Sequence, residues 1–273
     1  MKTGNAEVHL LSDGYFTLDA GAFFGIVPKV FWSRRFQADD DNRVRLALNV
    51  PLIRAKGWSA LIDSGIGSNF DEKFSSIFKI DKRENIIEQI SVFGEPSEIG
   101  LIVHSHLHFD HMGHSFEKNG GKPVFENAVL VAQEEEFSNL KNTNELTRSS
   151  YPGKNLMQHR GNRKAVTGSV RIKDGLKVVR TGGHTSGHQV VLFEDEKKFM
   201  YFGDLIPTTF HLRLPYVTAI DTFPLDTLKM KKKLIQKAID EKYICIFNHD
   251  TETKAAYLSG EASKVEIDPV DID

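Results

Sequence analysis

The stretch HLHFDH, residues 106–111, carries the strongest chemical signal in the chain. It follows the apolar run 99–103, which predicts a short buried strand. Alternate side chains of an extended segment point the same way, so His106 and His108 can bind one metal ion. If the chain then turns into a helix, Asp110 and His111 point to the other side and can bind a second ion. A buried polar group without a partner costs roughly 1–3 kcal/mol, so packing alone does not explain this cluster.

Ligand-type side chains also follow three later apolar runs. His184, Asp204 and His249 each come shortly after a predicted strand. Imidazole and carboxylate groups are the ligands expected for zinc and for other divalent metals such as manganese or iron. Because four apolar runs all end beside such residues, chance is a poor explanation. The pattern predicts a metal site assembled at the ends of separate strands.

The composition indicates an ordinary globular protein. Hydrophobic residues make up 40% and charged residues 26% of the 273 residues, which is typical of globular domains. A formal net charge of −2 gives no reason to expect nucleic acid or an anionic membrane as a partner. No run of about 18 apolar residues occurs, and the first residues lack the apolar core of a signal peptide. A cytoplasmic location is the default expectation.

Covalent catalysis finds no support in the sequence. The single cysteine, Cys245, excludes an internal disulfide and lies in the apolar run 243–247, which predicts a buried, inert thiol. No G-x-S-x-G motif is present to place a serine nucleophile.

We expect residues 1–273 to form one domain with two strand-rich halves. Three isoleucines, Ile86, Ile87 and Ile90, fall on one face at helical spacing and predict a helix. Residues 225–242 predict an amphipathic surface helix, with the run Lys231-Lys232-Lys233 on its solvated face. Strands are predicted at 6–11, 46–53, 60–62, 99–103, 128–132, 176–180 and 243–247, with a hairpin at 189–202.

Two segments of the chain are harder to place. Residues 141–170 are polar and turn-rich, and a connection of this length suits either a lid over a site or a plain surface excursion. Residues after about 260 are acidic and are expected to form a loosely packed tail.

Taken together, these motifs resemble those of the metallo-β-lactamase superfamily. HLHFDH, the later GGHTSGH (182–188), GD (203–204) and NHD (248–250) occur in the same order. Segments 19–29, 60–67 and 203–212 look like those of acyl-homoserine-lactone lactonases and the related methyl-parathion-hydrolase group, and the resemblance extends to about residue 250. It implies an α/β fold, a four-layer αββα sandwich.

The resemblance also implies a centre of two divalent ions, with zinc expected first and manganese or iron as alternatives. Asp63, directly after a predicted strand, would steady the ligand loop by hydrogen bonds, unless it only forms a turn. The implied ligands are His106, His108 and His184 on the first ion, Asp110, His111 and His249 on the second, and Asp204 bridging both.

Such a centre implies hydrolysis of an ester-type bond. Two ions about 3.5–4 Å apart hold a bridging hydroxide that attacks the substrate, and an N-acyl-homoserine lactone is the first substrate class. Asp110 and Asp204 are then the catalytic carboxylates, with Asp110 steering or accepting a proton. The expected partner is a small lactone or ester, and a homodimer is left open.

The substrate pocket is less clearly marked. Phe24 and Phe109 suit an apolar pocket wall, with ordinary core as an equal alternative. Lactonases of this family carry a tyrosine three residues after the bridging aspartate, where this chain has Pro207. An oxyanion donor would then come from the metal alone or from Thr208, Thr209 or His211.

Alternative functions remain open at this point. Pro207 keeps a phosphotriesterase or arylesterase of the methyl-parathion-hydrolase type as an alternative. A non-catalytic metal-binding member of the superfamily is a further alternative, although such a protein would be expected to have lost ligands. A thioesterase of the glyoxalase II type is disfavoured because its helical C-terminal extension has no clear counterpart.

Overall fold

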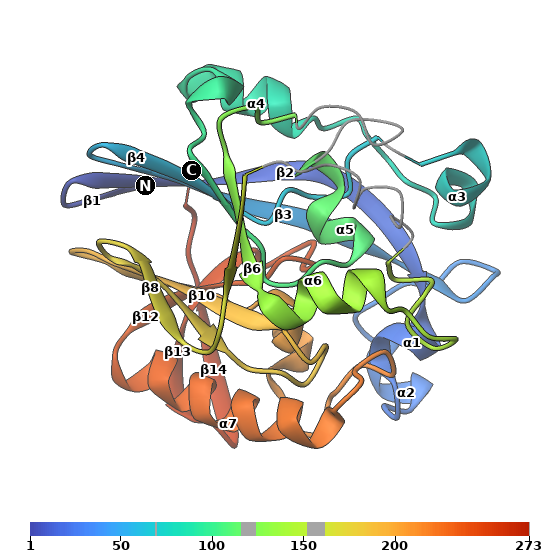
Figure 1. The fold of residues 1–273 in the computed structure, drawn as a ribbon. Helices are drawn as coiled ribbons and strands as arrows, with labels where there is room; N and C mark the ends of the chain where they lie inside the picture. The colour runs from blue at the N-terminus through green and yellow to red at the C-terminus, as the bar shows by residue number, and fades with distance from the viewer. Residues whose placement is uncertain (69, 116–123, 152–161, 273) are drawn as a thin grey trace.

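Two seven-stranded sheets face each other at the centre of the molecule, and helices cover their outer faces (Figure 1). The computed structural model describes residues 1–68, 70–115, 124–151 and 162–272. Both sheets mix parallel and antiparallel pairs. This architecture confirms the predicted αββα sandwich.

The first sheet contains the amino-terminal half of the chain. Its strands lie in sequence order, first antiparallel and then parallel from the fourth strand onward. They are β1 (Lys2–Thr3), β2 (Ala6–Asp19), β3 (Arg43–Ala55), β4 (Trp58–Ile62), β5 (Leu101–Val103), β6 (Val129–Gln133) and β7 (Arg163–Val166).

The second sheet contains the carboxyl-terminal half. The predicted hairpin is confirmed, because its two strands pair antiparallel with Val191 opposite Tyr201. The strands in spatial order are β14 (Lys264–Pro269), β13 (Ala255–Glu261), β12 (Tyr243–Ile246), β11 (Lys198–Tyr201), β10 (Gln189–Glu194), β9 (Leu176–Arg180) and β8 (Val170–Lys173).

The core forms because the strands are apolar on both faces. In β5, Leu101 and Val103 point between the sheets, whereas Ile102 packs with α4 (Ile86–Phe93) on the outer face. In β12, Ile244 points between the sheets and Cys245 packs with α7 (Pro224–Asp240). Figure 1 shows α4 above the first sheet and α7 below the second. Period-two alternation on doubly covered strands produces this continuous apolar pattern.

The remaining helices are short and lie near the ends of the strands. Cys245 is buried as predicted, and burial raises the pKa of its thiol. No helix among the described residues is long and apolar enough to cross a membrane. The short helices are α1 (Ala20–Phe24), α2 (Lys29–Trp32), α3 (Glu72–Ile77), α5 (Phe109–Met112) and α6 (Glu134–Lys141).

The expectation of a loose tail after residue 260 is wrong. Strand β14 pairs antiparallel with β13 along its whole length. Ile272 is buried, and its carbonyl accepts a hydrogen bond of 2.7 Å from the amino terminus of Met1. Acidic residues there occupy the exposed face of an edge strand, so composition alone was misleading.

The expectation that Lys231 faces solvent is also wrong. The predicted helix exists as α7, but Lys231 lies on its inner face and is fully buried. Its ammonium donates to the carbonyl oxygens of Arg213 (2.9 Å), Leu214 (3.3 Å) and Tyr216 (2.6 Å). The lysine therefore ties α7 to the loop that precedes Asp221.

The segment 141–170 is only partly described. Its end forms β7, which extends the first sheet beyond β6. Residues 152–161 lie outside the described residues, so the choice between a lid and a surface excursion stays a prediction.

Candidate metal centre

The predicted change from strand to helix within HLHFDH is present. Strand β5 ends at Val103, the chain bends at Ser105, and His108 is extended again with φ −70° and ψ 158°. Helix α5 begins at Phe109 and carries Asp110 and His111, whose ring centre lies 4.1 Å from that of His106. A short strand followed by a short helix thus directs ligand-type side chains toward two separate positions.

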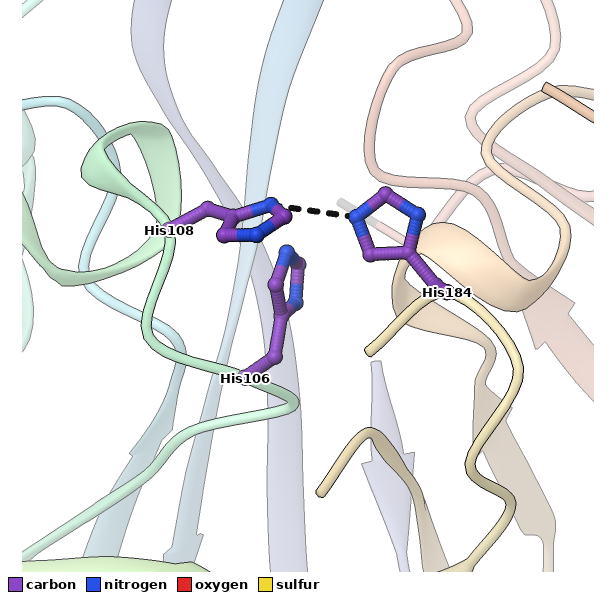
Figure 2. Close-up of side chains that lie close together, drawn as sticks. All are labelled: His106, His108 and His184. Carbon is purple, nitrogen blue, oxygen red and sulfur yellow. Dashed lines mark hydrogen bonds between the residues drawn. The ribbon is translucent and has the colours of Figure 1, made fainter. Parts of the chain in front are cut away.

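Three histidines converge at the first position. Figure 2 shows the rings of His106, His108 and His184 facing one another, with His184 arriving from the loop between β9 and β10. The Nδ1 atom of His108 lies 3.1 Å from the Nε2 atom of His184. Zinc–nitrogen bonds of about 2.0–2.1 Å in a tetrahedral site separate two ligand nitrogens by about 3.3 Å. The spacing fits two ligands of one ion.

A second group lies beside the first. His249, which follows β12, places its Nε2 atom 3.4 Å from Oδ2 of Asp110. The Nε2 atom of His111 lies 3.5 Å from the same oxygen. These three side chains are buried and form a second set of potential ligands.

Asp204 lies between the two groups. One oxygen, Oδ2, is 3.3 Å from Nε2 of His184, whereas Oδ1 is 3.3 Å from Nε2 of His111 and 3.2 Å from Nε2 of His249. Burial opposes ionisation, but His111, His249 and His184 outweigh it and hold the pKa of Asp204 well below its usual value. A buried carboxylate with one oxygen toward each group is arranged to bridge two cations.

The outer ring nitrogens of these histidines have acceptors of their own. Nδ1 of His111 donates to Asp63 (2.8 Å), Nδ1 of His184 donates to Asp221 (2.8 Å), and Nδ1 of His249 donates to the carbonyl of Ala47 (2.8 Å). Each bond fixes the tautomer that turns an Nε2 lone pair toward the centre. Burial opposes protonation, but nearby carboxylates, Asp204 among them, raise the pKa of His111, His184 and His249, so a cation that binds here would take the place of their protons.

Asp63 has the position expected for it beside the ligand loop. Its carboxylate accepts hydrogen bonds from the backbone (2.6 Å) and the hydroxyl (2.7 Å) of Ser105, and from the Tyr201 hydroxyl (2.8 Å). Burial opposes ionisation, yet His111 and His104 lower the pKa of Asp63. The loop before HLHFDH is thus held by one ionised side chain.

The residues present fit two divalent ions. The Nε2 atoms of His106 and His111 are buried and have no hydrogen-bond partner among the described residues. Buried polar atoms normally have partners, and a bound cation supplies one for a neutral imidazole nitrogen. Five imidazoles and two carboxylates are the donor set that zinc, manganese or iron accepts.

The two phenylalanines expected in the pocket wall lie in the core instead. Phe24 is fully buried and stacks on Trp32 with ring centres 5.0 Å apart. Phe109 is 9% exposed and packs edge-on against Phe16 and Phe74. Both belong to one aromatic cluster under α1, α2 and α3, so the core interpretation is the correct one.

All three side chains expected as oxyanion donors are already engaged. Nε2 of His211 lies 3.1 Å from the Phe23 carbonyl and must donate to it, so Nδ1 accepts from the Thr208 hydroxyl at 2.8 Å. Burial lowers the pKa of His211 to about 3, so the ring is neutral. The Thr209 hydroxyl donates to Asp250 at 2.6 Å, so none of the three side chains has a hydrogen left for a substrate. Of the oxyanion donors expected, the metal alone remains.

A cleft lies beside His108, one of the ligands of the first group. Its volume is about 290 Å³. Its walls include Asn139, Asn142 and Asn144, with Phe223 adding apolar surface. No lysine or arginine lines this cleft in the described part of the chain.

Sequence reasoning missed several residues around the centre. Asp221 and His188 are buried there, and His188 accepts a hydrogen bond of 3.1 Å from the backbone of Asp204. Burial, reinforced by His184, lowers the pKa of His188 to about 3, so it is a neutral acceptor. His188 stands in GGHTSGH and could have been found there, whereas Asp221 follows no strand and has no local signal.

Comparison with known proteins agrees with the fold and the centre. Residues 45–249 match the family model described as Metallo-beta-lactamase superfamily, and the chain belongs to this superfamily. An N-acyl homoserine lactonase from a Bacillus species is 28% identical over 180 residues, which span 63% of this chain and 63% of the relative. The N-acyl homoserine lactonase of Bacillus thuringiensis is 26% identical over 228 residues, covering 75% of this chain and 83% of the relative.

Solved structures agree as well. A protein described as a probable metal-dependent hydrolase from Staphylococcus aureus superposes with a TM-score of 0.91 at 29% identity, covering 99% of both chains. AidC, a dizinc quorum-quenching lactonase in complex with a product, superposes with a TM-score of 0.81 at 22% identity, covering 99% of this chain and 96% of the other. The chain is accordingly a hydrolase of this superfamily, homologous to N-acyl homoserine lactonases.

Proposed function

We propose that the protein opens lactone rings, with N-acyl-homoserine lactones as the substrate class, at a centre of two zinc ions. The observation that carries the proposal is Asp204, whose two oxygens face two separate groups of buried ligands. The homology to N-acyl homoserine lactonases supports the substrate class.

Two cations, when bound, would lower the pKa of a water molecule and polarise the carbonyl oxygen of the substrate. The side chains of this protein would hold the cations in place and accept a proton. Asp204 keeps one oxygen toward each position, and Asn248 fixes its Oδ1 with a hydrogen bond of 2.9 Å. Asp110 lies at the edge of the centre, 8% exposed, where its carboxylate can accept a proton released during ring opening.

The cleft beside His108 supports an uncharged substrate. Its charged or basic lining residues among those described are His108 and Asp221, and Asp221 already accepts bonds from His184 and Thr218. A substrate anion would therefore find no lysine or arginine among the described residues of the cleft, whereas amide and hydroxyl groups suit the neutral amide of an acyl-homoserine lactone. An anionic ester would bind poorly.

The test is a substrate panel on protein whose zinc content has been measured. Acyl-homoserine lactones from butanoyl to dodecanoyl are compared with paraoxon and 4-nitrophenyl acetate, and Asp204→Asn protein serves as the control. Lactone hydrolysis that the variant lacks is expected. Hydrolysis of paraoxon or the aryl ester alone would favour the phosphotriesterase or arylesterase alternative. No hydrolysis by protein holding two ions would favour a non-catalytic member.

A further inference from the structure

A buried glutamate outside the ligand set lies next to the first group of histidines. Glu136, in helix α6, has no exposed surface. Its Oε2 accepts from the backbone N–H of Leu107 (2.8 Å) and the Tyr151 hydroxyl (3.0 Å). Its Oε1 accepts from the Thr185 hydroxyl (2.6 Å) and the Asn139 amide (3.2 Å). All four bonds end on one carboxylate.

Two of the four donors belong to the segments that hold the first ion's ligands, and a third contacts one of those ligands. Leu107 stands between His106 and His108, and Thr185 directly follows His184. The Tyr151 ring packs edge-on against the His108 ring, with centres 4.7 Å apart. No bond of Glu136 reaches the segments that carry His249 or Asp204 among the described residues.

The GGHTSGH motif is built to approach this glutamate. A Cβ atom at Gly187 would lie 2.9 Å from both the backbone nitrogen and the Cγ atom of Glu136. Any larger residue would push the His184 loop away from α6. Gly187 is therefore required by close packing against the glutamate, which the motif alone does not reveal.

Charge gives the contact a second role. Glu136 forms no ion pair with any residue that the structure describes, and its four partners are neutral. A buried carboxylate without a cation is costly, whereas one beside a divalent ion is stabilised by it. The three imidazoles of the first group bind a cation only as neutral ligands, so a negative charge behind them favours a cation at that position.

We propose that Glu136 is the positioning residue of the first metal position. It fixes the two ligand loops against each other and adds a negative charge that raises cation affinity there, leaving the second position unaffected. The inference rests on the two-ion centre of the proposed function but does not depend on the lactone.

The experiment is stepwise zinc binding to the apo full-length protein, measured by competition with a chromophoric chelator, without substrate. Glu136→Gln is expected to raise one of the two zinc dissociation constants about 10–100-fold. This is the range seen when outer hydrogen-bond partners of metal ligands are removed. Glu134→Gln, an exposed neighbour on α6, is the matched control and should bind as the wild type does.

A double-mutant cycle assigns the effect to one position. Asp221→Asn perturbs His184 in the first group, and Asp63→Asn perturbs His111 in the second. The Glu136→Gln effect should be non-additive with Asp221→Asn and additive with Asp63→Asn. Unchanged zinc constants, or coupling to Asp63→Asn instead, would overturn the inference.

A milder variant keeps the inference testable if Glu136→Gln does not fold. Thr185→Val retains shape and removes one donor, so a smaller loss at the same position is expected. A lower unfolding temperature of the apo protein with both zinc constants intact would show a purely structural role and contradict the proposal. Because zinc binding is the readout, absence of lactonase activity would refute the proposed function without touching this inference.

Discussion

Replacing Asp63 by asparagine removes one negative charge from the support of the metal centre while keeping the side-chain shape. Asp63 has φ 61°, in the left-handed region where asparagine is among the best tolerated residues other than glycine. The substitution therefore adds little backbone strain. Its effect isolates the four hydrogen bonds that the carboxylate accepts.

The size of the effect depends on which carboxylate oxygen of Asp63 the amide group replaces. Oδ2 accepts from His111, the Ser105 hydroxyl and Tyr201, whereas Oδ1 accepts from the Ser105 backbone and lies 3.6 Å from Nδ1 of His104. An amide oxygen in the Oδ2 position keeps three bonds without charge and turns its NH₂ toward the Ser105 N–H. One buried donor left unsatisfied costs about 1–3 kcal/mol of unfolding free energy. A weaker partner for His111 should lower zinc affinity at the second position about 10–100-fold.

Two measurements test this reasoning. Urea denaturation of the apo proteins gives the loss of unfolding free energy, and chelator competition gives the two zinc constants. Asp268→Asn, on the exposed edge strand β14, is the charge-matched control and should change neither. If Asp63→Asn binds both ions as tightly as wild type, the role of Asp63 in orienting His111 is refuted.

Three further predictions concern metal, charge and pH. Removing metal with a chelator should lower the unfolding temperature by several degrees and zinc should restore it, since a ligand at about 1,000 times its Kd adds about 4 kcal/mol; an unchanged thermal scan would argue against a resident metal. Asp204→Asn should lower zinc content below two per chain and reduce hydrolysis more than about 100-fold, beyond the loss expected for an outer partner; normal metal content would contradict the bridging role. Burial lowers the pKa of Lys231 to about 7, so between pH 7 and the unfolded value of 10.5 the folded protein binds fewer protons. Relative to Lys231→Met, the wild-type unfolding free energy should thus rise with pH across this window by up to about 1.4 kcal/mol per unit, and parallel urea midpoints at pH 7.5 and 9.5 would refute this.

Local sequence determined the strands that lead to the ligands, but not the outer strands β7, β8, β13 and β14. Side-chain period and strand ends depend on neighbouring residues, so β5, the α5 turn and the pairing of His106 with His108 could be predicted from the sequence around HLHFDH. The short distance between His106 and His111 could not. The same logic placed Asp63 at a strand end beside the ligand loop. The placement of residues that depends only on their neighbours in the sequence could be predicted without knowing which elements pack against them.

Only the tertiary structure decided which polar residues are buried and which apolar residues line a space. Lys231 lies in a polar run on a helix, yet three carbonyl oxygens of a distant loop solvate it. Glu136 and Asp221 acquire their roles from donors on other elements, and Phe24 becomes core because Trp32 covers it. Sequence periodicity indicates how polar one face of a helix or strand is. Whether that face is buried depends on which other element packs against it, and such contacts join segments that are distant in the sequence.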